Sequence, residues 1–212
     1  MRRLVLCGSP RARGRAAALA LRVVEAYEQA GDEVGLVLLA EAVIAPCTGC
    51  NACKHNAATP LRDDLYCVIA DSMARVRRRL NDCDALTVVS PVYFSGAPAQ
   101  LKAFYDRLQP YYWSKYAKST KRPAGLFVVG EGGDPHGFEP LVSETRSALA
   151  VAGFRLERVH DWVGLVHEDG RLDDDRPVLE GGRTAAASDY CNETPSGLHP
   201  TYLRGGREAH HG

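Results

Sequence analysis

The stretch RLVLCGSPRARGRAAALALRVVEAYEQAG, residues 3–31, decides the start of the fold. Its apolar beginning, Arg3 to Cys7, predicts a short strand, and Gly8-Ser9-Pro10 ends that strand. Residues 15–30 are rich in Ala, Leu and Glu and contain no Gly or Pro. This composition predicts a helix that stops at Gly31. Strand, loop and helix in this order begin an alternating pattern.

The same alternation continues along the chain. The run Ala85 to Ser90 is apolar almost throughout, as a strand buried on both faces requires. Five strands alternating with helices predict an α/β fold, with a five-stranded parallel sheet and helices on both faces. The remaining expected strands are 34–39, 126–129 and 156–165, the expected helices are 71–81, 98–108, 138–152 and 177–190, and residues 40–71 are expected to be loop-like.

The composition narrows the function classes. The chain has 212 residues, and 26 Lys and Arg balance 26 Asp and Glu, so its formal net charge is zero. This balance gives no indication of a nucleic-acid or anionic-membrane partner. No apolar run approaches the roughly 18 residues that span a bilayer, and the N-terminal apolar stretch is too short for a signal peptide. We therefore expect a cytoplasmic protein with reduced cysteines.

Three loops should meet at one end of the sheet, because they follow its first, third and fourth strands. Residues 8–15 run into a helix N-terminus, where free N–H groups and arginines favour an anion such as phosphate. Residues 90–98 hold two aromatic side chains on a backbone fixed by prolines, and four of residues 130–137 are glycines, which allow close backbone approach. Although each loop alone also fits an ordinary connection, phosphate beside a planar ring predicts a mononucleotide, most naturally FMN.

Four of the seven cysteines cluster in the sequence. Cys47, Cys50 and Cys53 form two overlapping CxxC units, and Cys67 follows them. This spacing is usual for iron–sulfur ligation with a fourth cysteine from elsewhere, whereas structural zinc normally uses two separated pairs. A redox disulfide and unligated thiols beside a flavin are the other interpretations. From the residues alone, an iron–sulfur cluster, a zinc site and a metal-free site all remain open.

Six short stretches occur in a characteristic order over about residues 1–155. They are Gly8-Ser9-Pro10-Arg11, Pro46 to Cys53, Cys67 to Met73, Ser90 to Phe94, Gln100 to Phe104, and Asp106-Arg107. With them the chain resembles the flavodoxin-like NAD(P)H-dependent FMN reductases, and more narrowly the iron–sulfur flavoproteins. The resemblance implies a flavodoxin-like three-layer sandwich and an FMN-binding domain over residues 1–165, with its Cys-rich loop at 46–67. Residues 166–212 would be an extension packed on this domain or on a partner subunit.

The resemblance also assigns roles to particular residues. It implies noncovalent FMN, NADH or NADPH as co-substrate, a possible [4Fe-4S] cluster, and a homodimer or homotetramer. The implied phosphate ligands are Ser9, Arg11, Gly14, Arg15 and Ala16. The implied flavin-ring contacts are Pro91, Val92, Tyr93, Phe94 and Ser95 on one edge, and Gly132 and Gly133 on the other. The candidate substrate wall is Tyr93, Phe94 and His136, the candidate cluster ligands are Cys47, Cys50, Cys53 and Cys67, and Asp106 and Arg107 are expected to pair structurally.

Two departures from the family pattern stand out. The phosphate loop usually continues as Gly-Asn-Thr or Gly-Asn-Ser, but here it is Gly14-Arg15-Ala16, so a charge stands in place of a hydroxyl. The fourth cysteine usually follows the third within about half a dozen residues. Here the thirteen residues 54–66 separate Cys53 from Cys67, which we interpret as an insertion whose added length costs little entropy.

The expected activity is that of an FMN-dependent NAD(P)H oxidoreductase. Electrons would pass from reduced nicotinamide through FMN to a quinone, a free flavin or another small acceptor, with no obligatory protein acid or base. One alternative is an iron–sulfur flavoprotein that carries electrons between redox proteins. A second alternative, from another class, is a cysteine-based redox or metal sensor without turnover.

Overall fold

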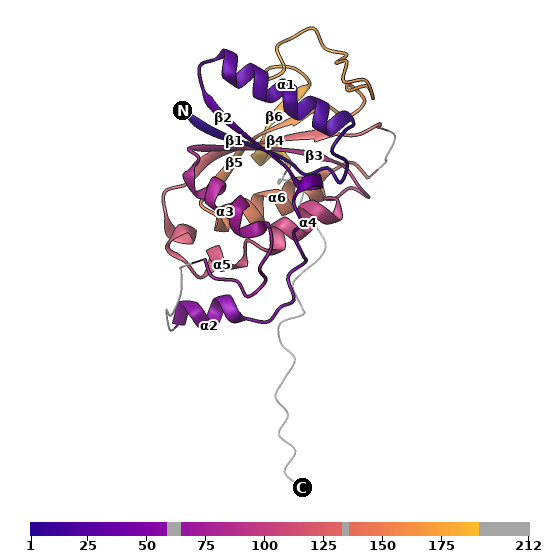
Figure 1. The fold of residues 1–212 in the computed structure, drawn as a ribbon. Helices are drawn as coiled ribbons and strands as arrows, with labels where there is room; N and C mark the ends of the chain where they lie inside the picture. Colours follow the sequence, from indigo (N-terminus) through magenta and orange to yellow (C-terminus); the bar gives the residue numbers. More distant parts are fainter. Residues whose placement is uncertain (59–64, 133–135, 191–212) are drawn as a thin grey trace.

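The computed structural model describes residues 1–58, 65–132 and 136–190 (Figure 1). A six-stranded sheet has the order β2-β1-β3-β4-β5-β6, in which β6 alone is antiparallel to its neighbour. The strands are β1 (Arg2–Cys7), β2 (Glu33–Leu38), β3 (Ala85–Pro91), β4 (Arg122–Val129), β5 (Phe154–Asp161) and β6 (Arg183–Ala186). The helices are α1 (Arg15–Gln29), α2 (Ala52–Ala58), α3 (Met73–Asp82), α4 (Ala99–Asp106), α5 (Gln109–Tyr112) and α6 (Glu139–Val151), with 3-10 turns η1 (Leu39–Glu41), η2 (Lys115–Lys118) and η3 (Ala187–Tyr190).

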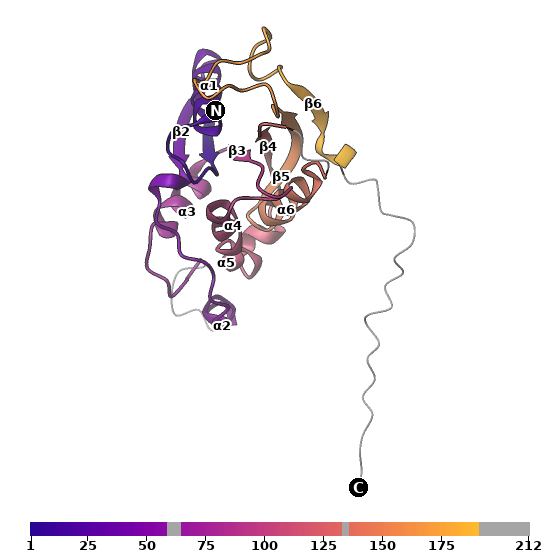
Figure 2. The same ribbon diagram turned by 90° about the vertical axis from the view of Figure 1, so that its right-hand side faces the viewer.

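The sheet separates two apolar layers, because alternate residues of each strand point to opposite faces. Leu4 and Leu6 of β1 pack into the layer of α3, α4 and α6, while Val5 and Cys7 face the layer of α1. The segment that follows β5 covers the α1 face as well, where Val166 and Val178 join the same cluster as the alanines of α1. The two views show α1 on one side of the sheet and α3, α4 and α6 on the other (Figures 1 and 2).

The chain reverses its direction of winding between β1 and β3, since β2 lies on one side of β1 and β3 on the other. This is the switch point at which open parallel sheets leave a crevice outside the carboxyl ends of their strands. The loops after β1, β3 and β4 open into that crevice. Among the described residues, no helix is both long and apolar enough to cross a bilayer.

The expected fold class is confirmed, with one more strand than predicted. The helix expected over 177–190 is wrong: residues 183–186 form β6 and residues 187–190 form η3. Gly181 and Gly182 interrupt that stretch, and Gly182 has a φ of 66°, outside helical geometry. Antiparallel pairing with β5, from Arg158 opposite Ala186 to Asp161 opposite Arg183, then decides the conformation. The expected loop 40–71 also contains α2, and β5 ends at Asp161 rather than at residue 165.

Candidate functional site

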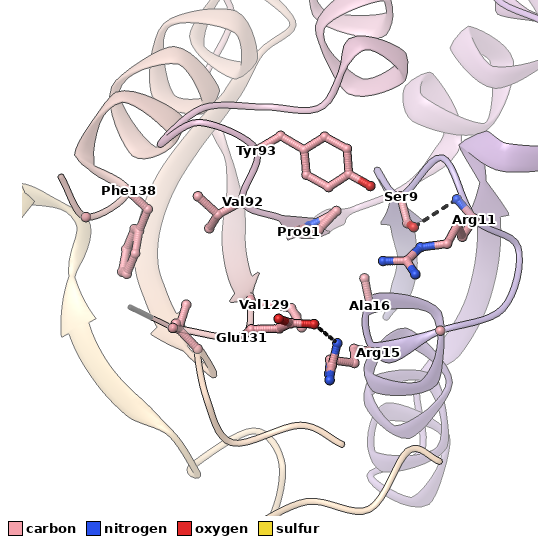
Figure 3. Close-up of a pocket in the computed structure, with 15 residues that line it drawn as sticks. Ser9, Arg11, Arg15, Ala16, Pro91, Val92, Tyr93, Val129, Glu131 and Phe138 are labelled. Carbon is pink, nitrogen blue, oxygen red and sulfur yellow. Dashed lines mark hydrogen bonds and ion pairs between the residues drawn. The ribbon is translucent and has the colours of Figure 1, made fainter. Parts of the chain in front are cut away.

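A cavity of about 350 Å³ lies at the carboxyl ends of β1, β3 and β4 (Figure 3). Its volume is within the range of small-molecule and cofactor pockets. The three loops that the sequence singles out all contribute to it. The lining residues are Ser9, Arg11, Gly14, Arg15, Ala16, Pro91, Val92, Tyr93, Val129, Gly130, Glu131, Gly132, Gly137, Phe138 and Val163.

One end of the cavity is shaped for an anion. Gly14 precedes α1 with a φ of 133°, which side-chain-bearing residues rarely adopt, so glycine allows the chain to enter the helix here. The first N–H groups of α1 have no partner within the helix and, with the helix dipole, favour a negative charge. Ser9 Oγ accepts a hydrogen bond from Arg11 N at 3.0 Å, which fixes the turn between β1 and the arginines.

Arg15 is already engaged in this structure. Its Nη1 lies 2.7 Å from Glu131 Oε1 and 3.6 Å from Glu168 Oε1, and its Nε donates to Val166 O at 3.1 Å. Both glutamates are largely exposed, whereas the Arg15 side chain is only 24% exposed. Glu131 reaches across the cavity from the glycine-rich loop to Arg15 (Figure 3). An incoming phosphate would therefore compete with a carboxylate for this guanidinium.

The other end of the cavity is apolar and aromatic. Pro91, Val92 and Tyr93 continue from β3, and Phe138 stands at the entrance to α6. Figure 3 shows the Tyr93 ring on the side of the cavity opposite Glu131, with its hydroxyl directed toward the Ser9 loop. Gly130 and Gly132 also line the cavity, and the Val163 side chain lies within 4 Å of the position that a Cβ would take at each of them. A flat ring can therefore contact aromatic side chains, glycine backbone and Val163.

Phe94 and Ser95 do not line this cavity. They are the central residues of a tight turn, in which Tyr93 and Gly96 exchange two backbone hydrogen bonds of 3.0 Å. Both have positive φ, 50° and 62°, as in the type I′ hairpin turn that normally selects Asn and Gly. Phe94 is fully exposed at the tip of the turn, whereas Ser95 is buried and its carbonyl accepts from Leu141 N.

The two remaining predicted residues are His136 and Gly133. His136 is exposed and does not line the cavity, although its neighbours Gly137 and Phe138 do. Gly133 lies outside the described residues.

The structure adds cavity residues that the sequence reasoning missed. Val129, Glu131, Phe138 and Val163 all line the cavity. Val163 comes from the loop after β5, and its N–H donates to Asp161 Oδ1 at 2.9 Å. Nothing local in the sequence marks Val163, but its place after a strand next to β4 would have indicated it once the strand order was known.

The cysteines line a second cavity, of about 370 Å³, on the side of the molecule where α2 and α5 lie. Its walls are Cys47, Thr48, Gly49, Cys50, Asn51, Ala52, Cys53, Cys67, Ile69, Asp106, Arg107, Gln109 and Pro110. All four thiols are free. Burial raises the pKa of Cys53, and the nearby sulfurs of Cys47 and Cys67 add to that rise. Hydrogen bonds from the Ala52 backbone and the Thr48 side chain lower the pKa of Cys50.

The four thiols of this cavity can be compared with the ligands that a metal ion or an iron–sulfur cluster needs. Within residues 1–58, 65–132 and 136–190, no three His, Cys, Asp or Glu side chains are grouped closely enough to hold a single ion. A [4Fe-4S] cubane makes a different demand, because each of its four thiolates binds a different iron. Four free thiols around one cavity match that donor set in chemistry and number.

Residues 1–159 match the model of the NADPH-dependent FMN reductases. The chain belongs to this family. An iron-sulfur flavoprotein of Methanosarcina thermophila is 28% identical over 160 residues, which are 76% of this chain and 71% of that protein. One from Methanocaldococcus jannaschii is 33% identical over 110 residues, 52% of this chain and 53% of the relative, so the match spans about half of that protein.

Solved structures of low sequence identity share the fold of this chain. The NAD(P)H:quinone oxidoreductase of Methanothermobacter marburgensis has a TM-score of 0.55 at 18% identity, covering 78% of this chain and 88% of that one. An FMN-dependent NADH-azoreductase of Bacillus anthracis, in complex with FMN, has a TM-score of 0.52 at 10% identity, covering 77% and 88%. These likenesses establish the flavodoxin-like architecture of the chain.

Proposed function

We propose that this chain is an FMN-dependent NAD(P)H oxidoreductase, which passes electrons to a quinone, a free flavin or another small acceptor. The observation that carries the proposal is the cavity at the switch point, which has arginines and the N-terminus of α1 at one end and Tyr93 at the other. Membership of the FMN reductase family supports it. Bound FMN would supply the two-electron chemistry, since the cofactor rather than a protein acid or base carries the hydride.

The protein's own residues would bind and orient the cofactor. Arg11, Arg15 and the first N–H groups of α1 would hold the phosphate, and Ser9 shapes the loop that presents them. Pro91, Val92 and Tyr93 would fix the plane of the ring. Glu131 would leave Arg15 when phosphate arrives, and an ion pair this exposed contributes under about 1 kcal/mol. The loss of that pair therefore opposes binding only weakly.

Binding and turnover test this proposal separately. The purified chain is titrated with FMN and with riboflavin, and NADH or NADPH oxidation is then followed with a quinone or free FMN as acceptor. We expect a 1:1 FMN complex tighter than the riboflavin complex, and reduced-nicotinamide oxidation that requires the flavin. A chain that binds neither flavin and oxidises neither nicotinamide would refute the proposal and favour the sensor alternative.

A second candidate is an iron–sulfur flavoprotein that exchanges electrons with another redox protein. The observation in its favour is the four-thiol cavity, and several relatives bear the name iron-sulfur flavoprotein. Anaerobic purification with iron and acid-labile sulfide analysis separates the candidates. About four irons per chain would support the cluster-bearing carrier, and flavin without iron would support the simple reductase.

A further inference from the structure

One side chain joins both ends of the cysteine loop. Nη1 of Arg107 donates to Ala45 O at 2.8 Å and to Asp71 Oδ2 at 2.7 Å. Its Nη2 donates to Ile69 O at 3.2 Å and to Asp71 Oδ1 at 3.1 Å. The Asp71 carboxylate in turn accepts from Ala45 N and Met73 N, both at 2.9 Å. Arg107 and Asp71 thus form a clamp, joining the chain just before Cys47 to the chain just after Cys67.

The clamp is shielded from water. The Arg107 side chain is 1% exposed and that of Asp71 is 8% exposed. Burial alone would raise the pKa of Asp71, but the hydrogen bonds from Arg107, Ala45 and Met73 hold it below its usual value. Outside the clamp, the backbone bond from Ser72 N to Val43 O, at 3.0 Å, also joins the two ends of the loop. Arg107 directly follows the last residue of α4, and its side chain bonds to both ends of the cysteine loop.

The clamp also borders the cysteine cavity directly. Arg107 and Cys67 both line it. Burial would lower the pKa of Arg107, but the hydrogen bonds to Asp71, with a smaller contribution from Cys67, raise it. Among the described residues, no acceptor lies within hydrogen-bond distance of the buried Arg107 Nε. Arg77 of α3 is a second guanidinium here, 8% exposed, whose Nη1 has no acceptor in the described chain. Among the described residues, Arg107 pairs with Asp71 and lines the cavity, whereas Arg77 lies near Cys67 without lining it.

We propose that Arg107, locked by Asp71, is the positioning residue of the four-cysteine site. It brings Cys67 against the turn that carries Cys47, Cys50 and Cys53, despite the thirteen inserted residues between Cys53 and Cys67. This inference concerns the cysteine site alone and stands independently of the proposed FMN chemistry.

Arg107→Lys tests the proposal, because lysine keeps the charge but cannot present two nitrogens to Ala45, Ile69 and Asp71 together. Arg122→Lys is the matched control. Arg122 also donates from one Nη1 to several backbone carbonyls, those of Leu80, Asn81 and Cys83, but away from the cysteine cavity. Asp71→Asn is a second variant, which decides the matter if Arg107→Lys fails to unfold cooperatively.

Two readouts are taken on the full chain. The first needs no metal: mild oxidation with diamide, followed by peptide mapping of the disulfide that links Cys67 to Cys53. The second is iron and acid-labile sulfide per chain after anaerobic reconstitution with ferrous iron and sulfide. FMN affinity is measured in parallel as an internal reference, since Arg107 does not line the first cavity.

We expect Arg107→Lys and Asp71→Asn to slow formation of the Cys53–Cys67 disulfide at least fivefold. If the unmodified chain binds iron, both variants should bind at most half as much. Their FMN affinity should change less than twofold. Arg122→Lys should leave linkage and iron unchanged. Unchanged linkage in both clamp variants would overturn the proposal, and so would an equal loss in Arg122→Lys, because the effect would then follow stability rather than position. If the unmodified chain binds no iron, the linkage rate alone decides.

Discussion

Replacing Arg15 by Gln is expected to weaken FMN binding and to leave riboflavin binding unchanged. Riboflavin has the same ring system but no phosphate, so the difference between the two ligands isolates the contact with the anion. Arg15 lies at the N-terminus of α1, in the wall of the cavity and one-quarter exposed. Glutamine keeps most of the side-chain length but removes the charge and the fork of donors.

The size of the effect follows from what Arg15 gains and what it gives up. A hydrogen bond to a charged group contributes about 1.5–3 kcal/mol. Its present partner Glu131, 2.7 Å away, must be displaced, and an exposed pair of this kind is worth up to about 1 kcal/mol. The net loss in Arg15→Gln is then about 1–2 kcal/mol, or about 5- to 30-fold weaker FMN binding. Glu131→Gln removes the competitor and should tighten FMN binding by up to about fivefold.

Quenching of flavin fluorescence measures both dissociation constants under the same conditions. Arg22→Gln is the matched control, because Arg22 is on the same helix but is exposed and paired with Glu25 outside the cavity. It should change neither constant by more than twofold. If Arg15→Gln weakened riboflavin and FMN equally, or if Glu131→Gln weakened FMN, the assignment of the phosphate to Arg15 would be refuted.

Three further predictions concern stability. His160, stacked on Phe127 at 4.1 Å, has its pKa lowered to about 4 by burial and by Arg158. Because this pKa lies below the ordinary value of about 6.5, the neutral His160 side chain stabilises the fold fully above pH 6.5, and that stabilisation is lost as the pH falls toward 4. Urea unfolding should thus show about 2 kcal/mol less stability at pH 4.5 than at pH 7, and His160→Gln should flatten that slope; parallel slopes would refute the reasoning. Gly8→Ala should destabilise by about 1–3 kcal/mol in thermal melts, since its Cβ would lie 2.7 Å from Leu101 Cδ2, while Gly125→Ala, with nothing within 4 Å, should not. Phe94→Asn should raise the melting temperature by a few degrees, because Asn tolerates positive φ and Phe94 buries nothing; a lower melting temperature would show that the ring makes a stabilising contact.

The fold could be predicted because its signals are local and repeat along the chain. The apolar run 85–90 and the glycine-free helix after residue 15 correspond closely to β3 and α1. The last strand could not be predicted in this way. Its four residues, Arg183 to Ala186, are stabilised by pairing with β5, including the contact of Thr184 Oγ1 with His160 Nδ1 at 3.0 Å. Pairing between segments more than twenty residues apart leaves no local periodicity to detect.

The candidate cavity was predictable in part, for a topological reason. Once the strands are taken as parallel, their following loops must share one edge, so the approach of residues 8–15 to residues 90–98 follows from strand order. The direction of each side chain, in contrast, does not follow from strand order. Tyr93 and Phe94 are adjacent aromatic residues, yet the tight turn places Tyr93 in the cavity wall and Phe94 fully in solvent. Only the two positive φ angles of that turn explain the difference, and neither Phe nor Ser signals them.

The cysteine site shows why the length of an insertion is a poor guide to whether a site survives. Extending the Cys53–Cys67 spacing from about six to thirteen residues roughly doubles the loop, which costs only about 0.6 kcal/mol of closure entropy. Removing one partner of a buried ion pair such as Arg107–Asp71 costs about 3–5 kcal/mol. The contacts at the ends of the loop therefore change the free energy several times more than the added loop length does. Arg107 was expected to pair structurally, but its partner lies 36 residues away, and only the packing of α4 beside the loop reveals which two ends it joins.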